Sequence, residues 1–166
     1  VYGKEDTMIT IQWDALLAEQ FDMYYIDENG DKVRPYIIHR TSMGCYERTL
    51  AWLIEKYAGA FPTWLAPVQV KLLPIADRHK EYLLKVKDEL EKAGMRVELD
   101  DCNEKIGFKI REAQLAKIPY MLVAGDKEAE NGTLSVRKRG GVDLGAQTLD
   151  EFMNFILKEI REKTIS

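Results

Sequence analysis

Residues 61–67 divide this chain into two parts whose hydrophobic patterns differ. Two prolines, Pro62 and Pro67, bracket a partly aromatic stretch, and proline interrupts both helices and the interior of sheets. Before this stretch, strand-like runs precede a single helical pattern. After it, strand-like and helix-like runs alternate. We therefore predict two structural parts, residues 1–60 and 68–166, joined by a linker that packs against its surroundings.

The first part has the pattern of antiparallel strands followed by a helix. Three runs are rich in β-branched and aromatic residues, at positions 8–13, 23–26 and 33–38. Asn29 and Gly30 between the last two predict a hairpin, because both residues tolerate positive φ. From Cys45 the apolar side chains recur with helical period until Gly59. Three strands and one helix leave much apolar surface uncovered, so we do not expect this part to fold alone.

The second part has the order βαβαββα. We expect strands at residues 68–73, 95–99, 120–124 and 133–139. Asp77 is placed to cap the first helix, the second begins near Ile106, and residues 148–151 form a capping box for the last. Strands that alternate with helices imply an α/β fold, a mixed sheet flanked by helices. This part is expected to fold alone.

Composition excludes several classes of protein. Hydrophobic residues make up 46% of the 166 positions and charged residues 31%, as in globular domains. No apolar run approaches the ~20 residues that cross a bilayer. No signal peptide is visible and the chain starts at Val1, so we expect either processing or a true beginning further upstream. Two cysteines without paired spacing, Cys45 and Cys102, favour the reducing cytoplasm.

His39 and Arg48 are the candidate functional residues of the first part. His39 ends an apolar strand, where it could ligate zinc or act as an acid or base; a lone histidine is more often simply hydrogen-bonded. Arg48 lies one turn into the helix, after a loop that includes Ser42, Gly44 and Cys45. Its planar guanidinium suits a phosphate, and the alternative is an ion pair with a neighbouring glutamate.

Other nucleotide-binding classes are disfavoured. The chain has no P-loop and no Gly-x-Gly-x-x-Gly motif, which argues against a Walker ATPase or a Rossmann enzyme. Gln12 and Thr10 share one face of their strand by two-residue alternation. They either line a polar pocket or form the solvated face of the sheet.

In the second part, polar and basic residues gather around one predicted helix and one side of the sheet. Lys105, Lys109 and Arg111 are placed to meet phosphates. Asn103 could read a base edge, and Glu128 could accept from a base amino group. We expect Arg137 on a strand that faces the same region. Each residue alone could be a solvated side chain, and their grouping favours RNA binding.

Two segments resemble a known family. Arg-Pro-Tyr-Ile-Ile-His-Arg at residues 34–40, with Gly-Cys-Tyr-Glu-Arg at 44–48, looks like motif 3 of class II aminoacyl-tRNA synthetases. Ala-Gly-Ala-Phe-Pro-Thr-Trp-Leu-Ala-Pro at 58–67 looks like the passage into the anticodon-binding domain of threonyl-tRNA synthetase. The resemblance runs from about Gly3 to Lys163. It implies a partial antiparallel class II catalytic sheet with the motif 3 helix, followed by an anticodon-binding domain.

The resemblance also implies roles for individual residues. His39 falls on one of three ligands of a zinc ion that holds threonine, and Arg48 on the arginine that binds ATP, which enters with magnesium. Gln12 and Cys45 fall in the amino-acid pocket. Many members have serine at the position of Cys45, and many have glutamine at the position of Thr7. Four positions match residues that contact the tRNA anticodon: Asn103, Arg111, Glu128 and Arg137.

The implied function is threonine–tRNA ligation by an intact enzyme, a cytoplasmic homodimer. Motifs 1 and 2, two zinc ligands and any editing domain are missing from this sequence, so the chain alone is expected to be inactive. A rival hypothesis is a stand-alone RNA-binding module with the anticodon-binding fold, although such a module has no use for Arg48. A class II enzyme for proline, histidine or glycine is a third, which His39 and the linker sequence disfavour.

Overall fold

The computed structural model describes residues 3, 5, 7–41 and 45–165. Its contacts divide the chain into two compact units, Val1–Lys56 and Tyr57–Ser166. Each unit is described by itself. The expected loop residues Ser42 and Gly44 lie outside the described part of the chain.

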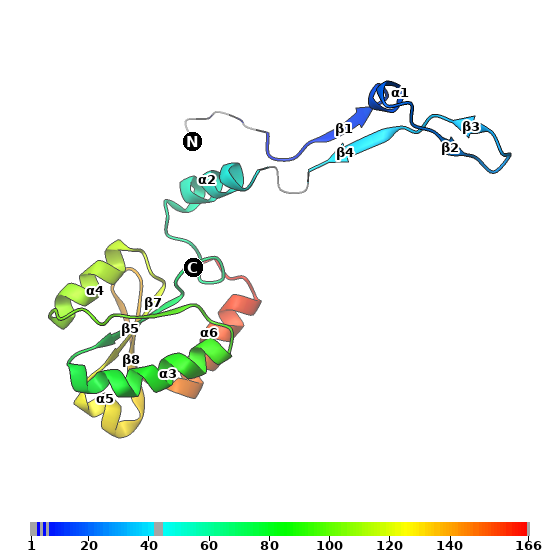
Figure 1. Cartoon of the computed structure of the whole chain (residues 1–166). Coiled ribbons are helices and arrows are strands. Elements are labelled where there is room, and N and C mark those ends of the chain that lie inside the picture. Colours follow the sequence, from blue (N-terminus) through cyan, green and yellow to red (C-terminus); the bar gives the residue numbers. More distant parts are fainter. Residues whose placement is uncertain (1–2, 4, 6, 42–44, 166) are drawn as a thin grey trace. The chain divides into compact units, whose positions relative to one another are not determined.

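The first unit is a ribbon of two strand pairs (Figure 1). Strand β1 (Ile11–Asp14) pairs antiparallel with β4 (Ile37–Arg40), and β2 (Tyr25–Ile26) with β3 (Lys32–Val33). A short helix, α1 (Leu17–Gln20), follows β1, and α2 (Tyr46–Tyr57) follows β4. We expected one strand over residues 33–38, but the structure has two, because Pro35 has no N–H for a ladder.

The hairpin between β2 and β3 forms where the Asn-Gly pair predicted it. The Asp27 carboxylate accepts hydrogen bonds from the backbone N–H groups of Asn29 and Asp31, both at 2.9 Å. Gly30 has a φ of +86°, a conformation that suits glycine. These contacts fix the turn and thereby the register of the two strands.

The second unit is built on a five-stranded mixed sheet with the strand order β6-β5-β7-β8-β9. The three neighbouring strands β6 (Val97–Leu99), β5 (Val70–Pro74) and β7 (Tyr120–Ala124) are parallel. Strands β8 (Thr133–Lys138) and β9 (Val142–Thr148) continue the sheet in antiparallel register. The expected mixed sheet covered by helices is therefore present.

Helices cover both faces of this sheet (Figure 1). One face carries α3 (Lys80–Lys92) and α6 (Leu149–Arg161), and the other carries α4 (Ile106–Leu115). Because β7 lies between these layers, all five of its residues are buried. Two shorter elements, the 3₁₀ turn η1 (Asp77–His79) and α5 (Asp126–Asn131), follow the carboxyl ends of β5 and β7.

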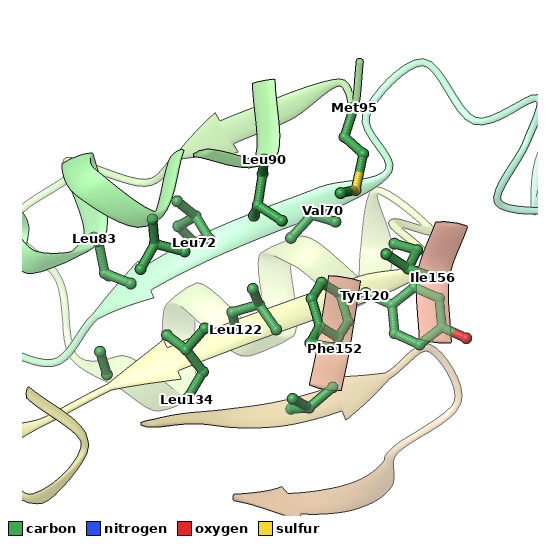
Figure 2. Packing of buried hydrophobic residues seen from close by; sticks show 13 residues of the cluster. Val70, Leu72, Leu83, Leu90, Met95, Tyr120, Leu122, Leu134, Phe152 and Ile156 are labelled. Carbon is green, nitrogen blue, oxygen red and sulfur yellow. The ribbon is translucent and has the colours of Figure 1, made fainter. Parts of the chain in front are cut away.

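The main hydrophobic core lies between the sheet and the α3/α6 layer. Figure 2 shows Leu72 and Leu122 of the sheet pointing toward Leu83 and Leu90 of α3, with Phe152 of α6 beside them. Burying a side chain of this size contributes about 1.5–3 kcal/mol. A smaller cluster packs α4 on the opposite face, with Leu73, Ala113, Ile118, Met121 and Val123.

The order of elements differs from the expected βαβαββα in two places. Helix α5 was not predicted, since its six residues, Asp-Lys-Glu-Ala-Glu-Asn, have no apolar period. Strand β9 was not predicted either, because it is a largely exposed edge strand interrupted by Gly145. The expectation that Asp77 caps the first helix is wrong, because Asp77 begins the 3₁₀ turn and pairs with Lys80 at 2.9 Å, while His79 occupies the N-cap position of α3.

The stretch around residues 61–67 packs into the second unit. The hydroxyl of buried Thr63 donates to Glu159 Oε1 of α6 at 2.6 Å, and the Tyr120 hydroxyl donates to Oε2 of the same carboxylate, also at 2.6 Å. The Gln69 amide donates to the Thr63 carbonyl at 3.0 Å. Arg139 donates to the Phe61 carbonyl at 2.9 Å. These polar contacts fix the segment against the sheet and α6.

Candidate functional sites

Strands β1 and β4 bring Gln12 and His39 to one face of the first unit. The two residues are directly opposite in the antiparallel register, so their side chains share a face. His39 Nε2 lies 3.2 Å from Asp14 Oδ2, and both Gln12 and His39 line an open hollow of ≈ 500 Å³ together with Asp14. The sequence predicted Gln12 and His39 as pocket residues and missed Asp14.

Asp14 is held in its ionised form by the start of α1. Its Oδ1 accepts from the backbone N–H groups of Leu17 at 2.8 Å and Leu16 at 2.9 Å. The hydrogen bond from Leu17, with the contact to His39, lowers the pKa of Asp14 below its ordinary value. The carboxylate is therefore a fixed acceptor that orients the imidazole of His39.

The imidazole of His39, with its carboxylate partner Asp14, fits zinc only as part of a larger site. An imidazole bonded through one nitrogen to a carboxylate is a common arrangement for a zinc ligand. Within the described ranges, however, there is no group of three or more His, Cys, Asp or Glu side chains placed to hold a metal. His39 is thus suited to be one zinc ligand, and the other ligands would have to come from outside the described residues of this chain.

Arg48 reaches back to the segment that precedes β1. Its Nη1 donates to the backbone carbonyl of Thr7 at 2.9 Å. The expected alternatives were a phosphate and an ion pair with Glu47 or Glu55. The contact with Thr7 joins the start of α2 to the segment before β1. Cys45, one residue before α2, is an exposed free thiol. The structure thus fixes the guanidinium at the helix start, where a phosphate was expected.

In the second unit, the carboxyl ends of the three parallel strands place polar loops at one edge of the sheet. Asn103 lies exposed in the loop after β6, and Glu128 lies in α5 after β7. Since carboxyl ends of parallel strands meet at the same edge, the two residues lie at one edge with the β5 loop between them. The edge therefore presents an amide and a carboxylate, groups that can read bases.

Asp100 and Lys109 shape the loop that carries Asn103. Lys109 is 4% exposed, and its Nζ donates to the backbone carbonyls of Pro74 at 3.3 Å and Asp100 at 3.4 Å. Burial alone would raise the pKa of Asp100, but hydrogen bonds from Cys102 and the charges of Lys71 and Lys109 lower it overall. The expectation that Lys109 meets phosphates is wrong, because the folded unit buries its ammonium group against these carbonyls.

Arg111 and Arg137 lie along the α4 face of the sheet. Arg137 of β8 is paired in register with Met121, which packs beneath α4, and cross-strand partners share a face. Its Nη2 binds Asp143 Oδ2 of β9 at 2.9 Å, next to a register shift between β8 and β9. Arg111 is exposed on α4. Arg137 lies level with Met121, and α5 with Glu128 follows Gly125, which is ~13 Å further along β7 at about 3.3 Å per residue. Arg137 and Glu128 are therefore well separated along the sheet.

A further polar cluster at the same edge was not predicted. Arg78 binds Asp126 with two hydrogen bonds, from Nε to Oδ1 at 2.8 Å and from Nη2 to Oδ2 at 2.6 Å. His79 Nε2 lies 2.8 Å from Asp126 Oδ1. The hydrogen bonds from Arg78 and His79 lower the pKa of Asp126. Charged residues directly after β5 and β7 were the available sequence signal, because both strands end at this edge.

The second unit has the fold of an anticodon binding domain. The family model of that description matches residues 69–159, more than half of the chain, and the chain belongs to this family. No helix in the described ranges is long and apolar enough to cross a membrane.

Relatives of this chain include threonine–tRNA ligases. The enzyme of Clostridium perfringens is 60% identical over 163 residues, and that of Listeria monocytogenes serotype 4a 53% identical over 159 residues. These matches cover 98% and 95% of this chain but 25% of each relative, so the chain spans about a quarter of their length. The expected resemblance to the C-terminal portion of threonyl-tRNA synthetase is confirmed.

A solved structure agrees with this relationship. The RNA binding domain of threonyl-tRNA synthetase from Cryptosporidium parvum Iowa II superposes with a TM-score of 0.80 at 34% identity. The match covers 95% of this chain and 40% of that one.

Proposed function

We propose that this chain is the motif 3 and anticodon-reading part of a threonine–tRNA ligase. The observation that carries the proposal is the 60% identity to such a ligase over 163 residues. That similarity includes the β1–β4 ribbon and α2 as well as the anticodon binding domain. A stand-alone RNA-binding module, the alternative, would require only the second unit.

In this proposal residues 68–166 read the tRNA anticodon and residues 61–67 link them to the catalytic part. Asn103 and Glu128 contact base edges from the carboxyl edge of the sheet. Arg111 and Arg137 meet phosphates or bases along the α4 face. Unpaired bases of an anticodon loop can be splayed out and read on their edges, which fits polar side chains spaced along the sheet.

Residues 1–60 contribute one side of the catalytic site, a partial antiparallel class II sheet with the motif 3 helix. Arg48 binds the phosphates of ATP, which enters with magnesium, and stabilises negative charge as the adenylate forms. Gln12 and Cys45 line the threonine pocket. His39, oriented by Asp14, would supply one ligand to a zinc ion. That ion would hold the amino and hydroxyl groups of threonine, and a site built for a hydroxyl rejects an isostere without one.

The partners that follow are tRNA, ATP, threonine and the remainder of the ligase. The remainder would supply motifs 1 and 2 and the other zinc ligands. We further propose a cytoplasmic homodimer as the intact enzyme. On this account the 166 residues alone bind RNA but do not form an aminoacyl adenylate.

A binding experiment tests the proposal directly. The affinity of the chain for the anticodon stem–loop of a threonine tRNA is measured by fluorescence anisotropy, beside a stem–loop of equal length with an unrelated anticodon. We expect at least about tenfold preference, as one or two base contacts worth about 1–3 kcal/mol each would give. Asn103→Ala and Glu128→Gln should remove most of it. Lys85→Met, on the exposed side of α3, is the control. Equal affinity for both stem–loops would contradict the proposal.

A further inference from the structure

The orientation of Glu128 depends on contacts made by the rest of α5. This helix has six residues, and a helix so short is not stable in isolation. Glu128 Oε2 already accepts from the Gly125 N–H at 2.9 Å, which ties the side chain to the helix start. Whatever fixes the first turn of α5 therefore also fixes the carboxylate of Glu128.

The first turn of α5 is held by two consecutive side chains from the turn after β5. Arg78 donates hydrogen bonds to both carboxylate oxygens of Asp126, the first residue of α5, and the ring of buried His79 contacts Oδ1. His79 Nδ1 accepts from the Ala76 N–H at 3.1 Å, so in the neutral ring Nε2 carries the proton and donates to Asp126. The histidine is thus fixed at both nitrogens, and one of these contacts reaches α5.

The β5 turn is a suitable support because it lies between the two base-reading loops. Strand β5 pairs with β7 on one side and β6 on the other. Toward β7, the Ile75 N–H donates to the Ala124 carbonyl at 3.0 Å, and a Cβ on Gly125 would lie 2.8 Å from Ile75 Cδ1. Toward β6, Lys109 joins the carbonyls of Pro74 and Asp100. The turn is packed against both neighbours.

We propose that Arg78 and His79 are positioning residues for base reading, which hold Asp126 and thereby place the carboxylate of Glu128 against the base that it contacts. This inference rests on the proposed function of the second unit. Neither residue needs to touch RNA. Their effect passes through α5, so it should vanish when Glu128 can no longer read a base.

The two nitrogens of His79 can be tested separately. His79→Asn retains an acceptor near the position of Nδ1 and loses the group that reaches Asp126. His79→Gln retains a donor near the position of Nε2. Discrimination is the ratio of the affinities of the chain for the threonine anticodon stem–loop and for single-base variants of it. We expect His79→Asn to reduce this ratio about fivefold at one anticodon position, and His79→Gln to keep it within about twofold of wild type.

A second variant, at an exposed residue, tests the same contact without changing the buried core. Arg78 is largely exposed, with 67% of its side chain accessible, so Arg78→Gln should not disturb the core. It should also lower discrimination at the same anticodon position. Circular dichroism and urea midpoints establish that each variant is folded.

A double-mutant cycle with Glu128→Gln decides between positioning and a general structural role. In the Glu128→Gln background, His79→Asn should leave discrimination unchanged. If folded His79→Asn and Arg78→Gln chains discriminate like wild type, or if His79→Asn lowers discrimination equally with and without Glu128, the inference is wrong. If the unaltered chain itself shows no base discrimination, the proposed function fails first, and the two failures are thereby distinguished.

Discussion

Replacing Tyr120 by Phe should destabilise the second unit through one lost hydrogen bond. Tyr120 has no exposed surface, and its hydroxyl lies 2.6 Å from a carboxylate oxygen of Glu159, which is 8% exposed. Burial, together with this carboxylate, raises the pKa of Tyr120 far above its usual value, so the hydroxyl remains a donor at any ordinary pH. The other oxygen of Glu159 accepts from Thr63.

The expected loss is about 2 kcal/mol in the free energy of unfolding. A hydrogen bond to a charged group contributes about 1.5–3 kcal/mol, and removing the donor leaves the buried carboxylate with less compensation. The ring itself stays, so its edge-to-face contact with Phe152, at 5.8 Å between centroids, is kept and no cavity arises. The change therefore isolates the polar contact from the packing.

Urea unfolding followed by tryptophan fluorescence measures this loss. Of the three tryptophans, only Trp64 belongs to the second unit. Replacing Trp13 and Trp52 by Phe makes the signal specific to that unit. Lys85→Met, in the same unit at a side chain that is 73% exposed, is the control and should change stability by less than about 0.5 kcal/mol. If Tyr120→Phe costs as little as the control, the hydrogen bond to Glu159 contributes nothing measurable to stability, contrary to this prediction.

Three further changes test the carboxyl edge of the sheet. Gly125→Ala should cost about 1 kcal/mol in urea unfolding, because the new Cβ would lie 2.8 Å from Ile75 Cδ1; Gly107→Ala, where nothing lies within 4 Å, should not destabilise. Lys109→Met should cost about 1–3 kcal/mol, since two buried carbonyls lose their donor. Folding lowers the pKa of Asp126, mainly through its hydrogen bonds with Arg78 and His79. The ionised carboxylate therefore stabilises the fold fully above the ordinary aspartate pKa of about 3.9. This stabilisation is lost as the pH falls through the lower pKa of the folded state. Urea midpoints between pH 5 and 2 should therefore fall more steeply for wild type than for Asp126→Asn.

A specific result would contradict each of the three predictions for Gly125, Lys109 and Asp126. Equal stability of Gly125→Ala and Gly107→Ala would show that the contact with Ile75 is loose. An unchanged urea midpoint for Lys109→Met would mean that its carbonyl contacts contribute nothing. Parallel acid profiles for wild type and Asp126→Asn would contradict the ion pair with Arg78.

The elements with strong periodicity were predictable from the sequence, and those shaped by neighbours were not. Strand β7 is a continuous apolar run, and α6 begins at a capping box in which Glu151 accepts from the Thr148 N–H at 2.9 Å. Helix α5 has no apolar stripe, and tertiary contacts from Arg78 and His79 hold its first residue. Strand β9 is exposed, so its sequence has no burial pattern to reveal it.

The candidate site shows the same division. The residue types at Gln12 and His39 were recognisable, and two-residue alternation put Gln12 on a polar strand face, but their pairing across β1 and β4 needed the register. Lys109 was read as a surface cation because sequence alone does not show that its amine turns inward. Arg78 and His79 act on Asp126, 48 and 47 positions away, and only the parallel pairing of β5 and β7 brings them together.

NMR mapping of the RNA-binding surface would show which face of the second unit the anticodon stem–loop contacts. Backbone amide shifts of the 166-residue chain are recorded as the threonine anticodon stem–loop is added. We predict that the largest changes fall in residues 102–104, 125–128 and 135–137, at the carboxyl edge and along the α4 face. Changes confined to α3 and α6, on the opposite face of the sheet, would contradict it.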